Sequence, residues 1–374
     1  MDTNRKGGNG MKYLFINSVA GVGSTGRIVA ETCRALQQQG HTCAIAYGRE
    51  KANCEDIETV CIGSPVDYKL HGALCRVTDR HGFYSRSATR KFLEWAKAYD
   101  PDVVWLHNIH GYYLHLGELF AWLKERRKQV KWTLHDCWAF TGHCAYFDFV
   151  GCDKWKTGCH HCPQKKEYPA TLLLDGSRAN YEDKKRLFTG LTDVQLYVPS
   201  NWLADRVKES FLREYPVEVV YNTVNEEIFK PTSGSFRREH GLEHKKIALG
   251  VASVWDRRKG LEDFVALASR LKEPWRIVLV GLTPEQAAKM PPNVISIPRT
   301  NNAVELAHIY STADVFVNLS VEETFGMTTL EALKCGTMPI VYAGTACEEV
   351  TKEFGGVAVE RFDWDGLLNA MEMK

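Results

Sequence analysis

The stretch "ADVFVNLSVEETFGMTTLEALKCGTMPIVYAG", residues 313–344, contains the pattern that decides the fold. Its apolar start, "ADVFVNLS", predicts a buried strand, and "TMPIVYAG" at its end predicts another. Between them, Gly326 begins a predicted helix that runs to about Cys335, with Gly336 in the usual stop position. A strand, a helix and a strand in this order predict two parallel strands joined by a crossover helix.

The same alternation recurs along most of the chain. From Met11, short β-branched or aromatic runs such as "KYLFINS", "DVVWLHN" and "VKWTLHD" alternate with amphipathic helical stretches, and the alternation restarts near Pro216 with "KKIALGVAS". The predicted fold class is therefore α/β, with two doubly wound, Rossmann-like parallel sheets. We expect a disordered tail at residues 1–10, an N-terminal domain at 11–200 and a C-terminal domain at 201–374.

The composition excludes several classes of protein. With 374 residues, 44% of them hydrophobic, the chain can bury two cores. Its 47 Lys and Arg residues balance 46 Asp and Glu residues, so no overall field favours nucleic acid or a membrane surface. No apolar run approaches the roughly 20 residues that span a bilayer, and the polar start "MDTNRKGGNG" lacks the apolar segment of a signal peptide. We therefore expect a cytoplasmic protein.

Candidate ligand-binding residues follow the predicted strands, where open parallel sheets bind their ligands. After the first strand, the glycines of "AGVGSTGRI" either let the backbone approach a diphosphate or a sugar, or only form a tight turn. After "KKIALGVAS", three cations precede Gly260, namely Arg257, Arg258 and Lys259. Because buried cations need an anion, we favour a bound phosphate over a solvated charge run beside Asp256.

The loop "VEETFG" and the helix behind it contain a second candidate anion site. The backbone N–H groups of Phe325, Gly326 and Met327 lie at the start of the predicted helix and can hold a phosphate. Glu331 lies about 7 Å further along the helix axis, and Glu323 precedes the glycine in the loop. A carboxylate accepts hydrogen bonds from two neighbouring hydroxyls, so two carboxylates flanking a diphosphate suit a nucleotide sugar.

These motifs resemble those of one enzyme family. "EETFGMTTLE" matches the pattern E-x-F-G-x-x-x-x-E of retaining glycosyltransferases of family 4, and "RKG", "LHD", "VPSNWLADRV" and "VVYNTVNEEIFKP" look like further segments of that family. The resemblance covers nearly the whole chain. It implies the GT-B architecture, in which an acceptor-side N-terminal domain and a nucleotide-sugar-binding C-terminal domain face a central cleft. It also implies a role of the kind found in bacterial surface polysaccharide biosynthesis.

The resemblance implies roles for single residues at the donor sugar. Glu331 would hold the ribose hydroxyls and Glu323 the transferred hexose, while the N–H groups of residues 325–327 would bind the diphosphate. His135, in the segment "LHD", would contact the sugar. The predicted catalytic residues are thus His135, Glu323, Arg258 and Lys259.

The resemblance implies further roles at the leaving phosphate. Arg258 and Lys259 would neutralise it, and Gly23 would lie close to it. Ser253 stands where many family members have an arginine, so Arg257 or Arg258 is the candidate replacement. Because fixed cations and helix N–H groups can stabilise the charge that develops on the diphosphate, we predict no catalytic divalent ion. Similarity to the family implies front-face attack with retention of configuration.

Four cysteines in a Cys-rich loop, residues 137–169, have spacings that suggest a metal site: Cys144, Cys152, Cys159 and Cys162. The final C-x-x-C is a good zinc half-site, whereas the first two cysteines are more widely spaced. Disulfides are disfavoured in a reducing compartment, which leaves structural zinc or reduced thiols that pack together, and we favour zinc. The loop follows His135, so we expect it to serve acceptor recognition rather than catalysis.

Two features remain open between a functional and a structural role. His107 and His110 in "LHNIHGYY" either contact the acceptor or bond the backbone as strand-end histidines. The run "KERRKQVK", residues 124–131, is either a solvated helix face or a patch that attracts anionic lipid near a lipid-linked acceptor. Peripheral contact with the inner face of a membrane therefore stays open.

The leading hypothesis is a retaining glycosyltransferase that moves a hexose from a nucleotide diphosphate sugar to a glycan or a lipid-linked glycan. A nucleotide-sugar epimerase of GT-B architecture would use the same cleft but would need acid and base groups around the hexose. A nucleic-acid-binding zinc module is disfavoured, and no nucleic-acid partner is expected, because the cysteine loop has no evident recognition helix and few basic residues. Those residues are Lys154, Lys156, Lys165 and Lys166.

Overall fold

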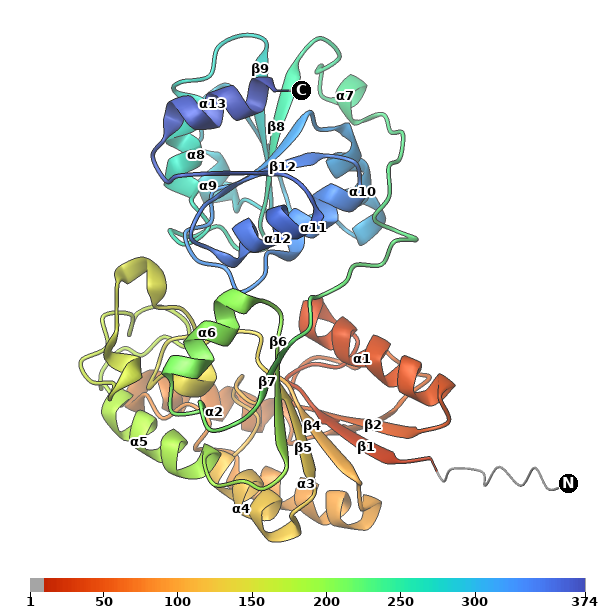
Figure 1. Cartoon of the computed structure of the whole chain (residues 1–374), viewed down its shortest axis with the longest axis vertical. Helices are drawn as coiled ribbons and strands as arrows, with labels where there is room; N and C mark the ends of the chain where they lie inside the picture. Colours follow the sequence, from red (N-terminus) through yellow and green to blue (C-terminus); the bar gives the residue numbers. More distant parts are fainter. Residues whose placement is uncertain (1–9, 374) are drawn as a thin grey trace, which may run out of the picture. The chain divides into compact units, whose positions relative to one another are not determined.

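The computed structural model describes residues 10–373, and the chain divides into two compact units (Figure 1). The first unit contains the chain up to Val198 together with Leu203–Val220, and the second contains Pro199–Trp202 together with the chain from Tyr221 onward. The predicted disordered tail lies outside the described residues except for Gly10. No helix within residues 10–373 is both long and apolar enough to cross a membrane.

The first unit is built on a seven-stranded sheet with the order β3-β2-β1-β4-β5-β6-β7, and every neighbouring pair is parallel. Its strands are β1 (Lys12–Ile16), β2 (Thr42–Tyr47), β3 (Glu58–Cys61), β4 (Val103–Leu106), β5 (Gln129–Thr133), β6 (Val194–Val198) and β7 (Val217–Val219). The sheet winds outward in two directions from the central pair β1 and β4. Ligands of such sheets bind at the carboxyl ends of the strands near this reversal.

The helices of the first unit alternate with these strands. They are α1 (Gly23–Gln38), α2 (Pro65–Thr78), α3 (Arg86–Tyr99), α4 (Leu116–Arg126), α5 (Ser177–Phe188) and most of α6 (Asn201–Glu209). The Cys-rich loop adds three single-turn 3-10 helices, η1 (Trp138–Phe140), η2 (Asp148–Val150) and η3 (Lys154–Lys156). α2 begins with a capping box, because the Ser64 side chain accepts from the Asp67 N–H and the Asp67 carboxylate accepts from the Ser64 N–H.

The second unit is built on a six-stranded parallel sheet with the order β10-β9-β8-β11-β12-β13. Its strands are β8 (Lys246–Val251), β9 (Trp275–Val280), β10 (Val294–Ile297), β11 (Val315–Asn318), β12 (Met338–Tyr342) and β13 (Val357–Val359). Its helices are α7 (Phe236–Glu239), α8 (Leu261–Ala268), α9 (Pro284–Ala287), α10 (Ala303–Thr312), α11 (Met327–Lys334), α12 (Ala346–Phe354) and α13 (Trp364–Glu372).

Alternate residues of the central strands in the second unit bury against different helices. In β9, Ile277 and Leu279 pack in a core with side chains of α8 and α13, whereas Val278 and Val280 pack in a core with side chains of α10 and α11. Helices accordingly lie on both sides of the sheet in Figure 1. A sheet covered on both faces needs strands that are apolar throughout, which explains runs such as "VFVN" in β11. The doubly wound α/β fold predicted from the sequence is confirmed.

The division between the units differs from the predicted boundary after residue 200. Residues 203–220 group with the first unit, because β7 pairs with β6 as the seventh strand of the first sheet. The short segment Pro199–Trp202 instead groups with the second unit, where Glu349 of α12 accepts hydrogen bonds from the backbone N–H groups of Asn201 and Trp202. The apparent restart of the pattern near Pro216 therefore marks the last strand of the first sheet.

Candidate functional site

The loop between β11 and α11 has a backbone that only glycine fits at Gly326. This residue has φ of 93°, in the left-handed region, and a Cβ atom would lie 2.4 Å from Sγ of Cys347. No side chain within the described residues caps the helix there. α11 therefore begins at Met327 without a side-chain cap from residues 10–373, and uncapped N–H groups at a helix start can bind an anion.

Glu323, in the same loop, forms an ion-pair cluster with two of the predicted cations. Its carboxylate contacts the Lys259 ammonium, and its Oε1 lies 3.7 Å from Nη1 of Arg258. Nη1 of Arg258 also donates to the Glu322 carbonyl at 3.0 Å. The two loops meet because their strands, β8 and β11, are neighbours in the sheet, and the Val321 N–H donates to the Arg258 carbonyl at 2.9 Å.

The charges in this cluster keep Glu323 ionised despite its burial. The Glu323 side chain is only 10% exposed. Burial alone would raise its pKa, but Lys259 and Arg258 outweigh that effect and hold the pKa below its ordinary value. Glu323 therefore contacts two cations, Lys259 and Arg258, in a partly buried setting.

Two further predicted donor residues, in the loop after β8, lie in more open positions. Arg257 and Ser253 are both exposed, so the structure separates them from the buried part of the cluster formed by Arg258 and Lys259. Glu331 lies inside α11 and is 7% exposed. Its Oε2 accepts a hydrogen bond of 3.0 Å from the Tyr310 hydroxyl of α10. Tyr310 was not predicted as a site residue, and its place in an amphipathic helix gave no signal of this role.

In the first unit, histidines gather at the carboxyl ends of β4 and β5. Nδ1 of His107 lies 3.0 Å from Nε2 of His135, and the two rings stack. Nε2 of His110 lies 3.0 Å from Oδ2 of Asp136, while its Nδ1 lies 3.0 Å from the Tyr168 hydroxyl. The rings of His107 and His110 therefore bond side chains rather than the backbone. These histidines and Asp136 line one small cavity.

Burial keeps part of this histidine cluster uncharged at neutral pH. Burial lowers the pKa of His135 to about 4 although Asp136 opposes the shift, and it lowers the pKa of His107 well below the ordinary value. Burial would raise the pKa of Asp136, but His110, the Trp138 N–H and His135 together outweigh it, and the pKa is lowered. Nε2 of His107 is buried without a hydrogen-bond partner in the described part of the chain. Neutral imidazoles can accept a hydrogen bond from a hydroxyl, as well as donate one.

Aromatic residues that the sequence did not single out surround His110. Its ring packs against Trp138, Tyr168 and His81. The His81 ring in turn contacts Tyr112, with ring centroids 4.4 Å apart and the rings tilted. Tyr168 follows the four cysteines, 58 residues away from His110 in sequence. Asp136 could have been found from the sequence, because it follows His135 directly in "LHD".

Gly23, predicted to lie in a glycine turn close to the leaving phosphate, is the first residue of α1. Its φ of 63° lies in the left-handed region, and a Cβ atom there would meet no atom within 4 Å. The backbone at this point is therefore open rather than packed against a neighbour, which is compatible with close approach of a ligand. The helix start has no side-chain cap within residues 10–373.

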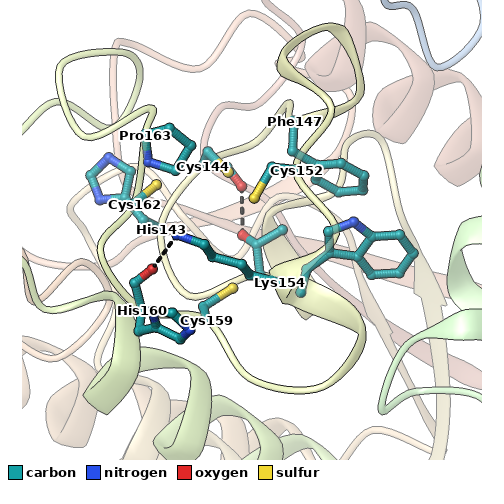
Figure 2. A pocket seen from close by; sticks show the side chains of 11 residues that line it. His143, Cys144, Phe147, Cys152, Lys154, Cys159, His160, Cys162 and Pro163 are labelled. Carbon is teal, nitrogen blue, oxygen red and sulfur yellow. Dashed lines mark hydrogen bonds between the residues drawn. The ribbon is translucent and has the colours of Figure 1, made fainter.

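The four predicted metal ligands lie around one cavity of the Cys-rich loop. Cys144, Cys152, Cys159 and Cys162 all line it together with His143 and His160, and Figure 2 shows the four sulfur atoms around its centre. All four are free thiols. As they stand, the side chains of residues 10–373 form no group of three or more His, Cys, Asp or Glu placed to hold a metal ion.

Two buried polar side chains support this cavity. Nδ1 of His143 lies 2.5 Å from Oδ1 of Asp79, whereas its Nε2 has no hydrogen-bond partner within the described residues. Lys184 of α5 is buried and donates to the carbonyl groups of Trp138 and Thr141 at 2.7 Å and 3.1 Å. Burial lowers the pKa of Lys184 to about 7. Neither residue was predicted as part of a site.

Two family models together match most of the chain. The model described as Glycosyltransferase Family 4 matches residues 25–228, more than half of the chain, and the model described as Glycosyl transferases group 1 matches residues 233–373. The chain belongs to glycosyltransferase family 4. The resemblance drawn from its motifs is thereby confirmed.

Curated relatives match part of the chain. The putative colanic acid biosynthesis glycosyl transferase WcaC of Escherichia coli (strain K12) is 36% identical over 208 residues, which cover 52% of this chain and 50% of that protein. Alpha-maltose-1-phosphate synthase of Mycobacterium tuberculosis (strain H37Rv) is 29% identical over 159 residues, which cover 36% of this chain and 41% of that protein. The chain thus matches half or less of the length of these relatives.

Solved structures match nearly the whole chain. Sucrose-phosphate synthase from Thermosynechococcus elongatus has a TM-score of 0.67 at 19% identity, covering 97% of this chain and 89% of that one. Anabaena HepE in complex with UDP and glucose has a TM-score of 0.64 at 14% identity, with coverage of 96% and 89%. WaaG, a glycosyltransferase involved in lipopolysaccharide biosynthesis, has a TM-score of 0.63 at 14% identity, with coverage of 96% and 90%. These likenesses establish the GT-B class of fold.

Proposed function

We propose that this protein is a retaining glycosyltransferase that moves a hexose from a nucleotide diphosphate sugar to a glycan or lipid-linked glycan. The observation that carries the proposal is the cluster of Glu323, Lys259 and Arg258 beside the start of α11. It combines a carboxylate able to hold sugar hydroxyls with two cations and helix N–H groups able to hold phosphate.

The chemistry of transfer requires this combination. Cleavage of a sugar–phosphate bond leaves negative charge on the diphosphate, and Lys259 and Arg258 stabilise that charge without a divalent ion. Without donor, the Glu323 carboxylate contacts both of these cations. When the diphosphate enters, it takes over part of that contact, and the Glu323 carboxylate becomes free to accept hydrogen bonds from the hexose. Glu331 holds the ribose hydroxyls at the other end of the nucleotide.

The histidine cluster of the first unit is the proposed acceptor side. Neutral His135 donates to or accepts from a sugar hydroxyl, and His107 and His110 position the acceptor. The relatives support such a reaction: WcaC is described as acting in colanic acid biosynthesis, and HepE has been crystallised with UDP-glucose. We infer a role in bacterial surface polysaccharide biosynthesis, at the inner face of the membrane.

A donor panel tests the proposal directly. UDP, GDP and ADP, and a nucleotide sugar of each, are added to the purified protein, and the thermal midpoint is measured; the cognate nucleotide raises it by mass action. The cognate nucleotide sugar is then incubated with and without candidate glycans, and the anomeric configuration of the product is read by NMR. A transferase releases nucleotide faster with acceptor and retains configuration. Conversion of the donor sugar into its epimer without acceptor, or activity lost to a chelator and restored by Mg²⁺, would overturn the proposal.

We further propose that Cys144, Cys152, Cys159 and Cys162 hold a structural zinc ion. The support is that the four thiols and His143 line one cavity, and that Nε2 of His143 has no hydrogen-bond partner within residues 10–373. Asp79 holds the other nitrogen of that ring, as a carboxylate does for a zinc-bound histidine. Because no three of these side chains are placed to hold a metal as they stand, the loop must tighten around the ion. His143 is an alternative fourth ligand to Cys152, which lies outside the C-x-x-C.

Metal analysis of the purified protein tests the zinc site. We expect about one zinc per chain, because four thiolate ligands bind zinc tightly. Cys159→Ser combined with Cys162→Ser should remove it, whereas Cys61→Ser, at an exposed cysteine in β3, should not. The zinc contents of His143→Gln and Cys152→Ser are compared, and the variant that loses more zinc identifies the fourth ligand. Less than about half an equivalent in the native protein would refute the site.

A further inference from the structure

Exposed apolar side chains gather on one part of the first unit. Within residues 10–373, fourteen large hydrophobic side chains are exposed, and seven of them lie in α2 or in residues 168–174. Six of the seven form what is called here the leucine surface: Val66, Leu70, Val77, Leu172, Leu173 and Leu174. Leu172 is 71% exposed and Val66 is 72% exposed. Single exposed apolar residues are common, but a concentration of this kind marks an interaction site.

The two segments that contribute to the leucine surface are held together by backbone hydrogen bonds. The N–H of Leu172 donates to the Arg76 carbonyl at 2.7 Å, and the N–H of Leu174 donates to the Val77 carbonyl at 3.1 Å. The leucine segment therefore lies against the C-terminal end of α2. Within α2, Val66, Leu70 and Val77 are four and seven residues apart, which places them on one face of the helix. Val77 and the leucine segment thus adjoin at the C-terminal end of α2, and Val66 and Leu70 extend the same helix face toward its start.

The charges on the exposed side of α2 are positive. Lys69 and Arg76 are exposed between the apolar residues. The only acid of the helix, Asp67, uses its carboxylate to cap the helix start through Ser64. An apolar helix face with interspersed cations fits the boundary between the head groups and acyl chains of an anionic bilayer. A protein partner would need complementary acids, whereas anionic lipids provide both components at once.

The other side of α2 leads to the proposed acceptor site. Tyr68 of this helix contacts Tyr112, with ring centroids 5.9 Å apart. Tyr112 lies beside Tyr168, whose hydroxyl bonds His110. Tyr168 is joined by three residues to the leucine segment. A lipid anchored under the leucine surface would therefore keep its head group close to the histidine cluster.

We propose that the leucine surface docks the protein on an anionic lipid bilayer, with its apolar side chains entering the acyl boundary and Lys69 and Arg76 contacting lipid phosphates. The proposal rests on the proposed function only in taking the acceptor to be lipid-linked. The leucine surface differs from the basic run at residues 124–131, because no large apolar side chain of that run is among the exposed ones in the described part of the chain.

Vesicle sedimentation of the full chain tests this docking surface. Vesicles of phosphatidylcholine alone are compared with vesicles that also contain phosphatidylglycerol, at low and high salt. We expect binding to the mixed vesicles. The triple variant Leu172→Ser/Leu173→Ser/Leu174→Ser should weaken it at least about tenfold, because the apolar contribution is lost. Lys69→Glu/Arg76→Glu should weaken it by a similar factor, mainly at low salt.

Two control variants make the test specific. Val254→Ser/Val304→Ser removes exposed apolar side chains of the second unit, and Arg126→Glu/Arg127→Glu removes charge from the basic run; both should bind vesicles as the native chain does. Equal loss in either control would overturn the proposal. Absence of vesicle binding by the native chain would also overturn it. A third contrary result would be self-association in ultracentrifugation that depends on the three leucines and persists when vesicles are added. Nucleotide-induced thermal stabilisation is measured for every variant, so a failure of donor binding is distinguished from a failure of docking.

Discussion

Glu323 and Glu331 are both buried carboxylates of the second unit, but their surroundings differ. Glu323 contacts two cations, Lys259 and Arg258, whereas Glu331 accepts from the neutral Tyr310 hydroxyl. Glu323 can therefore exchange its partners with an incoming anion. Glu331 is held in one position on a rigid helix, as suits a residue that binds the unreactive end of a ligand.

Alanine substitution should separate the two roles. We expect Glu331→Ala to weaken binding of the cognate nucleoside diphosphate by roughly tenfold, the loss of a hydrogen bond to a charged group. We expect Glu323→Ala to lower kcat by about 100-fold or more while nucleotide affinity changes little, because its contacts stabilise the transferred sugar. Calorimetric titration and steady-state kinetics measure the two effects. Equal effects of both changes on binding would contradict the assignment.

The ion pair at Glu323 predicts a pH dependence of stability. The pKa of Glu323 lies below its ordinary value in the folded protein, so its ion pairs contribute stability above pH about 4.5 and lose it as pH falls through the folded pKa. Lys259→Met should cost about 2 kcal/mol in the free energy of unfolding at pH 7, because the buried carboxylate loses a partner. The cost should shrink in acid, where Glu323 is protonated.

Chemical denaturation from pH 7 to pH 3 measures this difference. The double variant Glu323→Gln/Lys259→Met is the control, because it has neither charge. Its free energy of unfolding should differ from that of Glu323→Gln by the same amount at every pH. A cost of Lys259→Met that does not change with pH would show that Lys259 stabilises the fold through its packing instead.

At the level of single elements, α11 depends on the conformation of Gly326. The strand before it and the helix after it were predicted from apolar runs and the position of glycine, and both are present. The sequence could not show why glycine is required. The reason is Cys347 of α12, twenty-one residues on, whose Sγ occupies the space that a Cβ atom would take.

Gly326→Ala should therefore be more damaging than an ordinary glycine substitution. The left-handed backbone costs alanine about 1 kcal/mol of folding free energy. Overpacking against Cys347 adds about 1–3 kcal/mol, so the whole destabilisation should be roughly 2 to 4 kcal/mol. Gly344→Ala is a matched control, because its φ is 80° but no atom lies within 4 Å of the added Cβ. Denaturant midpoints of both variants give the comparison. Equal destabilisation would show that the Cys347 contact relaxes without cost.

At the scale of the whole molecule, two separate cores should unfold separately. Each unit has its own sheet and its own buried side chains, so calorimetry should resolve two transitions. The cognate nucleoside diphosphate should raise the midpoint of only one of them, that of the second unit, and Glu331→Ala should reduce the rise. Proteolysis at a temperature between the two midpoints identifies which unit has unfolded, because the unfolded unit is cleaved and the folded one is not. A single transition that moves as a whole with nucleotide would contradict independent unfolding.

The alternation of apolar strands and amphipathic helices was sufficient to predict two parallel sheets, because this periodicity is a local property of the chain. It also placed the candidate residues at strand ends. It was insufficient for the boundary between the units, since β7 looks like any short strand until its pairing with β6 is known. The three cations at residues 257–259 were predicted to need an anion, but the sequence did not identify Glu323 as the anion that contacts two of them.

The sequence by itself determined which residues could carry chemistry: the cations after β8, the acids around Gly326, the histidines after β4 and β5, and the cysteines. Only the tertiary structure decided which of these meet. Lys259 and Glu323 are 64 residues apart and contact because β8 and β11 are neighbours, and His110 meets Tyr168 across 58 residues. Sequence patterns report periodicity over a few turns, whereas strand order and loop packing are set by burial of the whole core, and these long-range pairings follow from that order.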